Sequence, residues 1–222
     1  MEGSAGKIEW QALGRVHYGE AFSFQEMLRV RRISGEIADR ILLLEHPPVI
    51  TMGRRDCSGD ILSHPNELRE AGIEVVKTNR GGRATYHGPG QLMGYLILSL
   101  DGLRMGIRDL VNRVEEICLA TLADFGVSAG RDEENPGLWV GRNKVVAIGM
   151  NVSRGVTQHG FAMNVGGDLG AYRHIVACGL AGRGVTSIER EIGARPDVAG
   201  VASRFIEHAG ATLGREMVRL VD

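Results

Sequence analysis

Cysteine is scarce in this chain. The 222 residues include three cysteines, Cys57, Cys118 and Cys178, and no two of them have Cys-x-x-Cys spacing. An odd number of cysteines without that spacing argues against a disulfide framework and against a zinc knuckle. The seven histidines lack the His-x-x-x-His and His-Glu-x-x-His patterns of metal sites. The sequence predicts no metal site, and we expect no cofactor.

Long hydrophobic runs are also missing. The longest, Ile41 to Leu44 and Leu92 to Leu100, are far shorter than the roughly 20 residues that span a bilayer. The first residues, Met1 to Lys7, lack the positively charged segment and apolar core of a secretory signal. We therefore expect a cytoplasmic protein with no membrane contact.

Neither sign of charge dominates. The 26 basic and 27 acidic residues give a formal net charge of −1, and the isoelectric point is near 6.7. This balance provides no basic field for nucleic acid. A hydrophobic share of 43% is ordinary for a soluble globular protein. The length fits one domain, residues 1–222, and is sufficient to bury a core.

Glycine, by contrast, is abundant: 32 residues, about twice the usual share of roughly 7%. Residues 80–91 read Arg-Gly-Gly-Arg-Ala-Thr-Tyr-His-Gly-Pro-Gly-Gln. Glycine lets backbone amides approach a ligand and permits positive φ, so this stretch predicts a binding surface. It contains neither the phosphate-loop pattern nor Gly-x-Gly-x-x-Gly. A plain glycine-rich hairpin is the alternative, although it does not account for the polar side chains.

Hydrophobic periodicity predicts strands mixed with helices. Strands are expected at 7–16, 40–45, 49–54, 73–77, 92–100, 137–141, 144–149 and 158–165, and helices at 19–32, 65–71, 107–125 and 197–213. Gly72 and Gly126 are expected to end helices, and Asp197 to cap one. The turn before strand 144–149 is placed at Arg142-Asn143. Consecutive hairpins favour a largely antiparallel or mixed sheet.

The residue types alone give only weak signals of chemistry. Cys178 has the character of a nucleophile, but the apolar residues before it are equally typical of a buried wall, which we would favour without further information. Lys144 begins an apolar strand, where a lysine is usually solvated. Cys118 lies in the apolar stripe of helix 107–125 and is interpreted as a core side chain.

Five separated motifs, in one order, resemble those of the lipoyl(octanoyl) transferases. These enzymes move an octanoyl group from acyl carrier protein to a lysine of a lipoyl domain. The motifs are Glu45-His46-Pro47-Pro48-Val49 with Thr51-x-Gly53-Arg54, the 80–91 stretch, Gly137-x-Trp139 with Lys144-Val145-x-Ala147-Ile148-Gly149, His159-Gly160-Phe161-Ala162-x-Asn164, and Ile175-Val176-x-Cys178-Gly179 with Val185-Thr186-Ser187.

The resemblance implies an α/β fold of mixed α+β type, a single domain with a mixed sheet flanked by helices, similar to the catalytic domains of biotin- and lipoate-protein ligases. It implies an acyltransferase whose donor is octanoyl-acyl carrier protein. The acceptors it implies are lipoyl domains of 2-oxoacid dehydrogenase complexes and the glycine cleavage H protein. It also implies a monomer.

The family's catalytic roles fall on Cys178, which would carry the acyl group, and on Lys144, which would favour the thiolate. The acyl-binding residues that the resemblance implies are Arg80, Gly81, Gly82, Arg83, Ala84, Thr85, Tyr86, His87, Ala147, Ile148, Gly149, Gly160, Phe161 and Ala162. Backbone amides at 81–82 or 178–179 are candidate oxyanion donors. His87 and His159 either orient the thioester or satisfy the loop backbone.

Three residues depart from the usual family pattern. Arg83 and Ala84 replace an acidic or amide residue and a larger aliphatic residue, and Ala177 stands where proline often precedes the cysteine. Chain-length preference and carrier docking therefore stay open. Two rival functions remain: a lipoate-protein ligase that uses ATP, and a non-catalytic acyl- or lipoyl-domain-binding protein. Cys178 in its motif argues against the first, and the pair with Lys144 argues against the second.

Overall fold

The structure is a computed structural model that describes residues 6–55, 59–132, 136–176 and 183–221. The strands are β1 (Lys7–Arg15), β2 (Asp39–Glu45), β3 (Val49–Met52), β4 (Glu74–Lys77), β5 (Thr85–His87), β6 (Gln91–Ile97), β7 (Gly130–Arg131), β8 (Gly137–Val140), β9 (Asn143–Ser153), β10 (Val156–Asn164), β11 (Gly184–Val185) and β12 (Glu216–Arg219). The helices are α1 (Tyr18–Ile33), α2 (Pro65–Glu70), α3 (Leu100–Leu103), α4 (Ile107–Asp124), the 3₁₀ helix η1 (Leu169–His174), α5 (Ile188–Ile192) and α6 (Val198–Leu213).

One large mixed sheet forms the centre of the fold. Within the described ranges its order is β12-β1-β2-β6-β10-β9-β8-β7, with β11 also beside β9. The β12-β1, β1-β2 and β11-β9 pairs are parallel, and the other pairs are antiparallel. No described helix has both the length and the apolar character needed to span a bilayer. The expected α/β class with a mixed sheet is confirmed.

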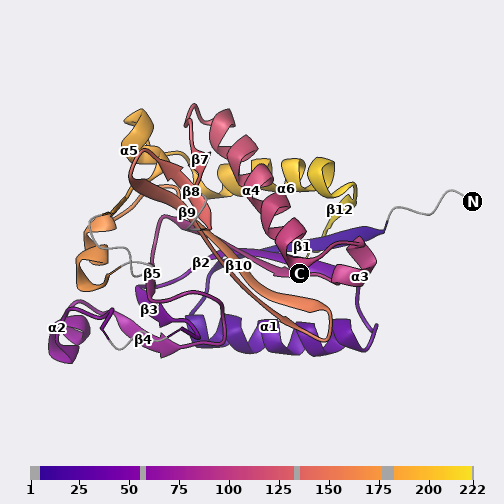
Figure 1. Ribbon diagram of the computed structural model, residues 1–222, viewed down its shortest axis with the longest axis horizontal. Coiled ribbons are helices and arrows are strands. Elements are labelled where there is room, and N and C mark those ends of the chain that lie inside the picture. Colours follow the sequence, from indigo (N-terminus) through magenta and orange to yellow (C-terminus); the bar gives the residue numbers. More distant parts are fainter. Residues whose placement is uncertain (1–5, 56–58, 133–135, 177–182, 222) are drawn as a thin grey trace, which may run out of the picture.

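Helices cover both faces of this sheet, as Figure 1 shows, with α4 and α6 on one side and α1 on the other. The alternation of side chains along a strand explains the two layers. On β2, Ile41 and Leu43 pack into the cluster that contains α4 and α6. Leu42 and Leu44 pack into the cluster that contains α1. A continuous apolar run is therefore the mark of a strand buried on both faces.

A second, smaller sheet has the order β4-β3-β5. Its side chains pack with α2 and η1 in a third cluster that includes Ile50, Leu68 and Tyr86. Because β5 belongs to this sheet and β6 to the large one, residues 88–90 carry the chain from one sheet to the other. Gly90 has φ +89°, a conformation that favours glycine. The glycine-rich stretch thus joins the two sheets.

The predicted elements are confirmed, with differences at their ends. The strand expected at 92–100 ends at Ile97, because the Ser99 hydroxyl accepts from the Gly102 amide and starts α3. The turn expected at Arg142-Asn143 lies one residue earlier, since Val140 pairs with Asn143. The expected cap at Asp197 is confirmed, with its carboxylate accepting from the Gly200 amide. Strand β12 was not expected.

A glycine in β6 makes room for the central aromatic contact. An added Cβ at Gly94 would lie 2.0 Å from Phe161 Cε1, and the Phe161 ring packs on Phe205 with centroids 4.4 Å apart. We expect Gly94→Ala to lower the free energy of unfolding by about 1–3 kcal/mol, because overpacking shifts both rings. Urea denaturation measures this. Gly19→Ala in α1 is the control, since nothing lies within 4 Å of its added Cβ; equal destabilisation by both would contradict the assignment.

Candidate active site

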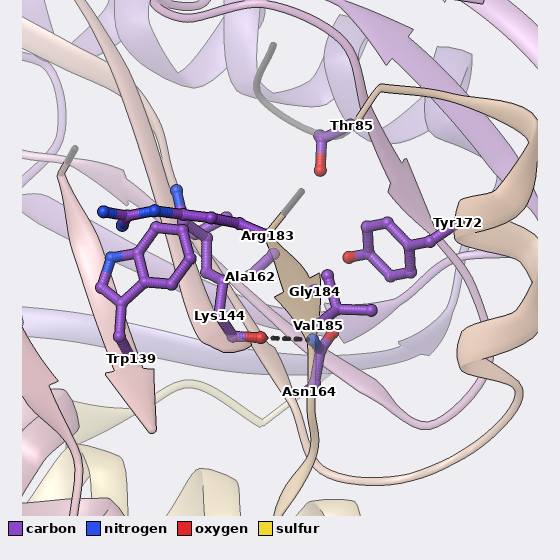
Figure 2. A pocket seen from close by; sticks show the side chains of 10 residues that line it. Thr85, Trp139, Lys144, Ala162, Asn164, Tyr172, Arg183, Gly184 and Val185 are labelled. Atoms are coloured by element: carbon purple, nitrogen blue, oxygen red, sulfur yellow. Dashed lines mark hydrogen bonds between the residues drawn. The ribbon is translucent and has the colours of Figure 1, made fainter. Parts of the chain in front are cut away.

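A cavity of about 310 Å³ lies between the glycine-rich stretch and strands β9 and β10. All the predicted acyl-binding residues except Ala84 and Tyr86 line it, as does Lys144. It shares Thr85, Lys144, Ala147 and Ala162 with the smaller cavity of Figure 2. Residues far apart in the sequence therefore meet at one place, while their role in acyl binding stays a prediction.

Two predicted pocket residues point elsewhere. Ala84 is fully buried, and its amide donates to the Asp60 carboxylate (3.3 Å). Tyr86 belongs to the core of the small sheet, where its ring meets Tyr172 edge-on at 5.5 Å between centroids. The alternation along β5 explains this, because Thr85 and His87 face the cavity and their neighbours face away. Cys178 lies outside the described residues.

The glycine-rich stretch makes close backbone contacts with neighbouring glycines and with β9. The Gly81 amide donates to the Met150 carbonyl of β9 (3.1 Å). An added Cβ at Gly149 would lie 3.1 Å from the Gly81 carbonyl oxygen, and one at Gly53 would lie 2.3 Å from that of Gly82. The loop thus lies directly on β9 and on the end of β3. The Gly81 amide therefore already has an acceptor, and the choice of oxyanion donors stays a prediction.

Arg80 fixes the same loop from inside. Its side chain is buried, with 8% exposure. Its Nε and Nη2 donate to the Thr51 hydroxyl (3.1 and 2.9 Å), Nη2 also donates to the Thr51 carbonyl, and Nη1 donates to the Gly81 carbonyl (3.0 Å). A guanidinium suits this task because its donors are held in a planar fork. Arg80 therefore fastens the loop to β3 and contributes a positive charge to the cavity wall.

A chain of hydrogen bonds continues from Thr51 across the site. The amide oxygen of Gln91 can only accept, so His87 Nδ1 donates to it (2.7 Å). His87 Nε2 then accepts from the Thr51 hydroxyl (3.2 Å). The Gln91 amide nitrogen donates to Asn164 Oδ1 (2.8 Å), and Asn164 donates to the Thr186 carbonyl (2.9 Å). Four of the sequence motifs are joined in this way.

Three buried histidines next to the cavity are neutral. Burial lowers the pKa of His46 to about 4 and, with the charges of Arg80 and Arg29, that of His159 to about 3. Burial also lowers the pKa of His87 well below its usual value. His159 Nε2 pairs with Asn79 Oδ1 (2.6 Å), and His46 pairs with the Val16 carbonyl and the Tyr95 hydroxyl. The printed partners of His87 and His159 are side chains and not the loop backbone, so the two roles expected for these histidines stay predictions.

Lys144 lies at the junction of the two cavities. Its residue is 8% exposed, and its Nζ donates to the Pro136 carbonyl (3.2 Å). The ammonium lies 4.6 Å from the centroid of the Trp139 ring, and the Arg183 guanidinium lies 4.7 Å from the same centroid. Figure 2 shows Arg183 extended alongside the indole. A solvated lysine, the plain sequence interpretation, is therefore wrong.

Trp139 and Arg183 were not among the predicted site residues. Trp139 is paired with Lys144 across the β8-β9 hairpin, so the hairpin spacing was a usable signal. Arg183 precedes β11, which pairs with β9 at Asn143 and Lys144, and no local pattern revealed that pairing. Cations over an aromatic face gain about 0.5–2 kcal/mol. The indole thus helps to hold Lys144 at the cavity.

The floor of the larger cavity consists of small residues on neighbouring strands. Ala147 of β9 pairs with Ala162 of β10, and Gly149 pairs with Gly160. Side chains this short leave space between the sheet and the glycine-rich stretch above it. Met93 and Tyr95 of β6 add apolar wall beyond Ala162. The arrangement suits an unbranched apolar chain that lies on the sheet with its polar end toward Lys144.

Comparison with known sequences gives consistent matches. A family model for the lipoyl protein ligase A/B catalytic domain matches residues 17–210. An octanoyltransferase of Solibacter usitatus is 44% identical over 206 residues, which cover 93% of this chain and 93% of that protein. An octanoyltransferase of Alkaliphilus metalliredigens is 44% identical over 182 residues, covering 82% and 84% of the two chains.

Solved structures share the fold at low identity. A bipartite lipoate protein ligase from Thermoplasma acidophilum, studied with its E2 lipoyl domain, has a TM-score of 0.75 at 15% identity, covering 98% of this chain and 88% of that chain. The biotin protein ligase from Aquifex aeolicus in complex with biotin and ATP has a TM-score of 0.55 at 12% identity, covering 94% and 70%. These likenesses concern the fold alone.

The neutral histidines predict a pH dependence of stability. Their folded pKa values lie below the unfolded value of about 6.5, so below that pH the unfolded chain binds protons that the folded chain does not. We expect the free energy of unfolding to fall from pH 7 to pH 5, by at most about 1.4 kcal/mol per histidine per pH unit. Urea denaturation at several pH values measures this. His46→Gln should flatten the slope; a stability independent of pH in this range would contradict it.

Proposed function

The chain belongs to the lipoyl protein ligase A/B catalytic domain family and to its octanoyltransferases, and on this basis we propose that it transfers an octanoyl group from octanoyl-acyl carrier protein to a lysine of lipoyl domains. The acceptors in this proposal are lipoyl domains of 2-oxoacid dehydrogenase complexes and the glycine cleavage H protein. Residues 1–222 act as one catalytic domain, as a monomer in the cytoplasm.

One observation carries the proposal beyond family membership: the buried amine of Lys144 opens onto a cavity with a floor of small residues. An octanoyl chain needs an apolar channel, and its carbonyl needs a polar reaction centre at one end. Ala147 and Ala162 supply the first and Lys144 marks the second. Cys178 is the proposed nucleophile by its place in the sequence motif.

The proposed reaction has two steps. In the first, Lys144 accepts the Cys178 thiol proton, the thiolate attacks the thioester carbonyl, and the carrier's thiol leaves with that proton. One thioester replaces another, so the step is reversible. In the second, the acceptor lysine amine attacks octanoyl-Cys178, Lys144 accepts a proton from the amine, and the Cys178 thiol leaves with it. An amide replaces a thioester, which makes this step strongly downhill.

The positive charges of the site suit this chemistry. A cation near a cysteine favours its thiolate. Lys144 becomes such a cation once it holds the thiol proton, and Arg183 lies near the same indole ring. Arg80 adds a fixed charge in the cavity wall. For the tetrahedral intermediates, the candidate oxyanion donors are now the Gly82 amide and those next to Cys178, because the Gly81 amide bonds to Met150.

The rival functions require different observations. A lipoate-protein ligase would need ATP and free acid and would form no acyl-enzyme. A non-catalytic binding protein would bind the acyl donor without turnover. The fold does not separate them, since one fold hosts several chemistries. The covalent intermediate therefore decides between them.

We expect one octanoyl adduct by intact-protein mass spectrometry after incubation with octanoyl-acyl carrier protein and no acceptor, because the thiol exchange needs no second substrate. Hydroxylamine should remove the adduct, and Cys178→Ala should not form it. Cys118→Ala is the matched control: Cys118 is fully buried, and burial raises the pKa of its thiol well above the usual value. An octanoylation that instead requires octanoate and ATP would establish the ligase.

The same assay tests the role of Lys144. We expect Lys144→Ala to slow adduct formation by about 10²–10⁴-fold, the usual contribution of a positioned acid or base. Lys144→Arg keeps the charge but cannot accept a proton at neutral pH. If Lys144→Arg restores the rate, charge alone is sufficient; if both variants are slow, proton transfer is required. An unchanged rate in both variants would contradict the assignment.

The short side chains on the floor of the cavity predict a limit on the length of the acyl chain. We expect Ala162→Leu to reduce transfer of octanoyl and decanoyl groups by 10-fold or more, because its larger side chain fills the space between sheet and loop, at a cost of about 1–3 kcal/mol for overpacking. Butanoyl transfer should change much less. Competition assays with thioesters of several lengths measure this. Ala123→Leu on the exposed face of α4 is the control; equal losses at all lengths would place the acyl chain elsewhere.

A further inference from the structure

Residues 60–62 lie against the segment that leads to Cys178. Ile61 and Ile175 form an antiparallel bridge. The Leu62 amide donates to the His174 carbonyl (2.8 Å), and the Val176 amide donates to the Asp60 carbonyl (2.7 Å). Val176 precedes Cys178 by two residues, so their Cα atoms are at most about 7.6 Å apart. The backbone of Asp60 thus holds the chain just before the proposed nucleophile.

The side chain of Asp60 reaches the glycine-rich stretch at the same time. It is 3% exposed. Its oxygens accept from Arg83 Nε (2.9 and 3.2 Å) and Nη2 (2.6 Å), and Oδ2 also accepts from the Ala84 amide (3.3 Å). The next residue, Thr85, lines both cavities. A single residue therefore connects the wall of the cavity with the segment before Cys178.

The cost of burying a charge explains why Asp60 is paired with Arg83. A buried carboxylate is costly unless it is paired and hydrogen-bonded, and removing its partner leaves the charge uncompensated. Arg83 satisfies both oxygens in the two-pronged geometry that guanidinium favours. Arg83 is also one of the positions where this chain departs from the pattern it resembles, with a base in place of an acid or amide. In this chain, Asp60 provides its counter-charge.

We propose that Asp60 is a positioning residue for the first half-reaction: by binding Arg83 and Ala84 with its carboxylate and Val176 with its backbone carbonyl, it ties Val176, two residues before Cys178, to the wall of the cavity. This inference depends on the proposed function. Asp60 acts on the rate at which Cys178 is acylated and does not contact the acyl group. A misplacement of about 1 Å at a reacting centre can cost up to 100-fold in rate.

The test uses Asp60→Asn, which keeps the shape of the side chain and one acceptor while removing the charge. The full chain is mixed with octanoyl-acyl carrier protein, and octanoyl adduct formation is followed by rapid quench and mass spectrometry. We expect acylation about 10- to 100-fold slower than in the wild type. The kcat/KM for the lipoyl-domain acceptor should not change, because in a two-step exchange that ratio reports only the half-reaction that follows acylation.

Asp39→Asn is the matched control. Asp39 is another buried carboxylate that accepts from one arginine, Arg32 (2.6 Å), and one backbone amide, Ser99 (2.8 Å). Asp39 is the first residue of β2 and pairs with Ile8 of β1. It therefore lies at the opposite end of β2 from the end that approaches the site. Its loss should lower the free energy of unfolding by a similar amount and leave the acylation rate unchanged. Urea denaturation of both variants makes the comparison.

Arg83→Gln is the second variant, for use if Asp60→Asn does not fold. The Arg83 side chain is 38% exposed, so its replacement breaks the pair from the solvent side. It should slow acylation in the same direction. The proposal is overturned if a folded Asp60→Asn or Arg83→Gln variant is acylated at the wild-type rate, or if Asp39→Asn slows acylation equally. Failure of the wild type to form an adduct would instead overturn the proposed function.

Discussion

The contact between the glycine-rich backbone and strand β9 is the constraint on which the site depends. The Gly81 amide bonds to the Met150 carbonyl, and a Cβ at Gly149 would crowd the Gly81 carbonyl oxygen. Because main chain lies directly on main chain, the distance between the loop and the sheet cannot change without breaking or crowding this contact. The height of the cavity above Ala147 and Ala162 is set by that contact.

Next to this cavity Arg80 is charged, whereas the neighbouring histidines are neutral. Arg80 is buried but fully engaged with Thr51 and Gly81, so it holds the loop while keeping its charge. The nearby imidazoles of His87 and His159 are neutral, and burial is the main cause of their lowered pKa values. A neutral imidazole can both donate and accept, which extends the hydrogen-bond chain without adding repulsion next to Arg80. The polar groups of this wall are therefore bonded to the surrounding protein.

The parts of the fold that could be predicted from sequence are those with a local cause. Helix α4 and strand β2 show periodicity, and the Asp197 cap is a side-chain preference. Strand β12 was not predicted, because its pairing with β1 joins the two ends of the chain and has no local sequence signal. In the site, Lys144 and the loop could be found by motif. Asp60 and Arg183 could not, because their contacts exist only after folding.

The proposed chemistry explains why contacts such as that between Asp60 and Val176 should affect the rate of acylation. An acyl group that moves between two thiols changes little in free energy, so the protein must lower a barrier rather than drive an equilibrium. In this proposal Lys144, restrained by Trp139 and the Pro136 carbonyl, accepts the proton from a defined position. The nucleophile must then come to it within hydrogen-bond reach. In the proposal, the hydrogen bond between Asp60 and Val176 adds nothing to donor binding but raises the fraction of approaches that succeed.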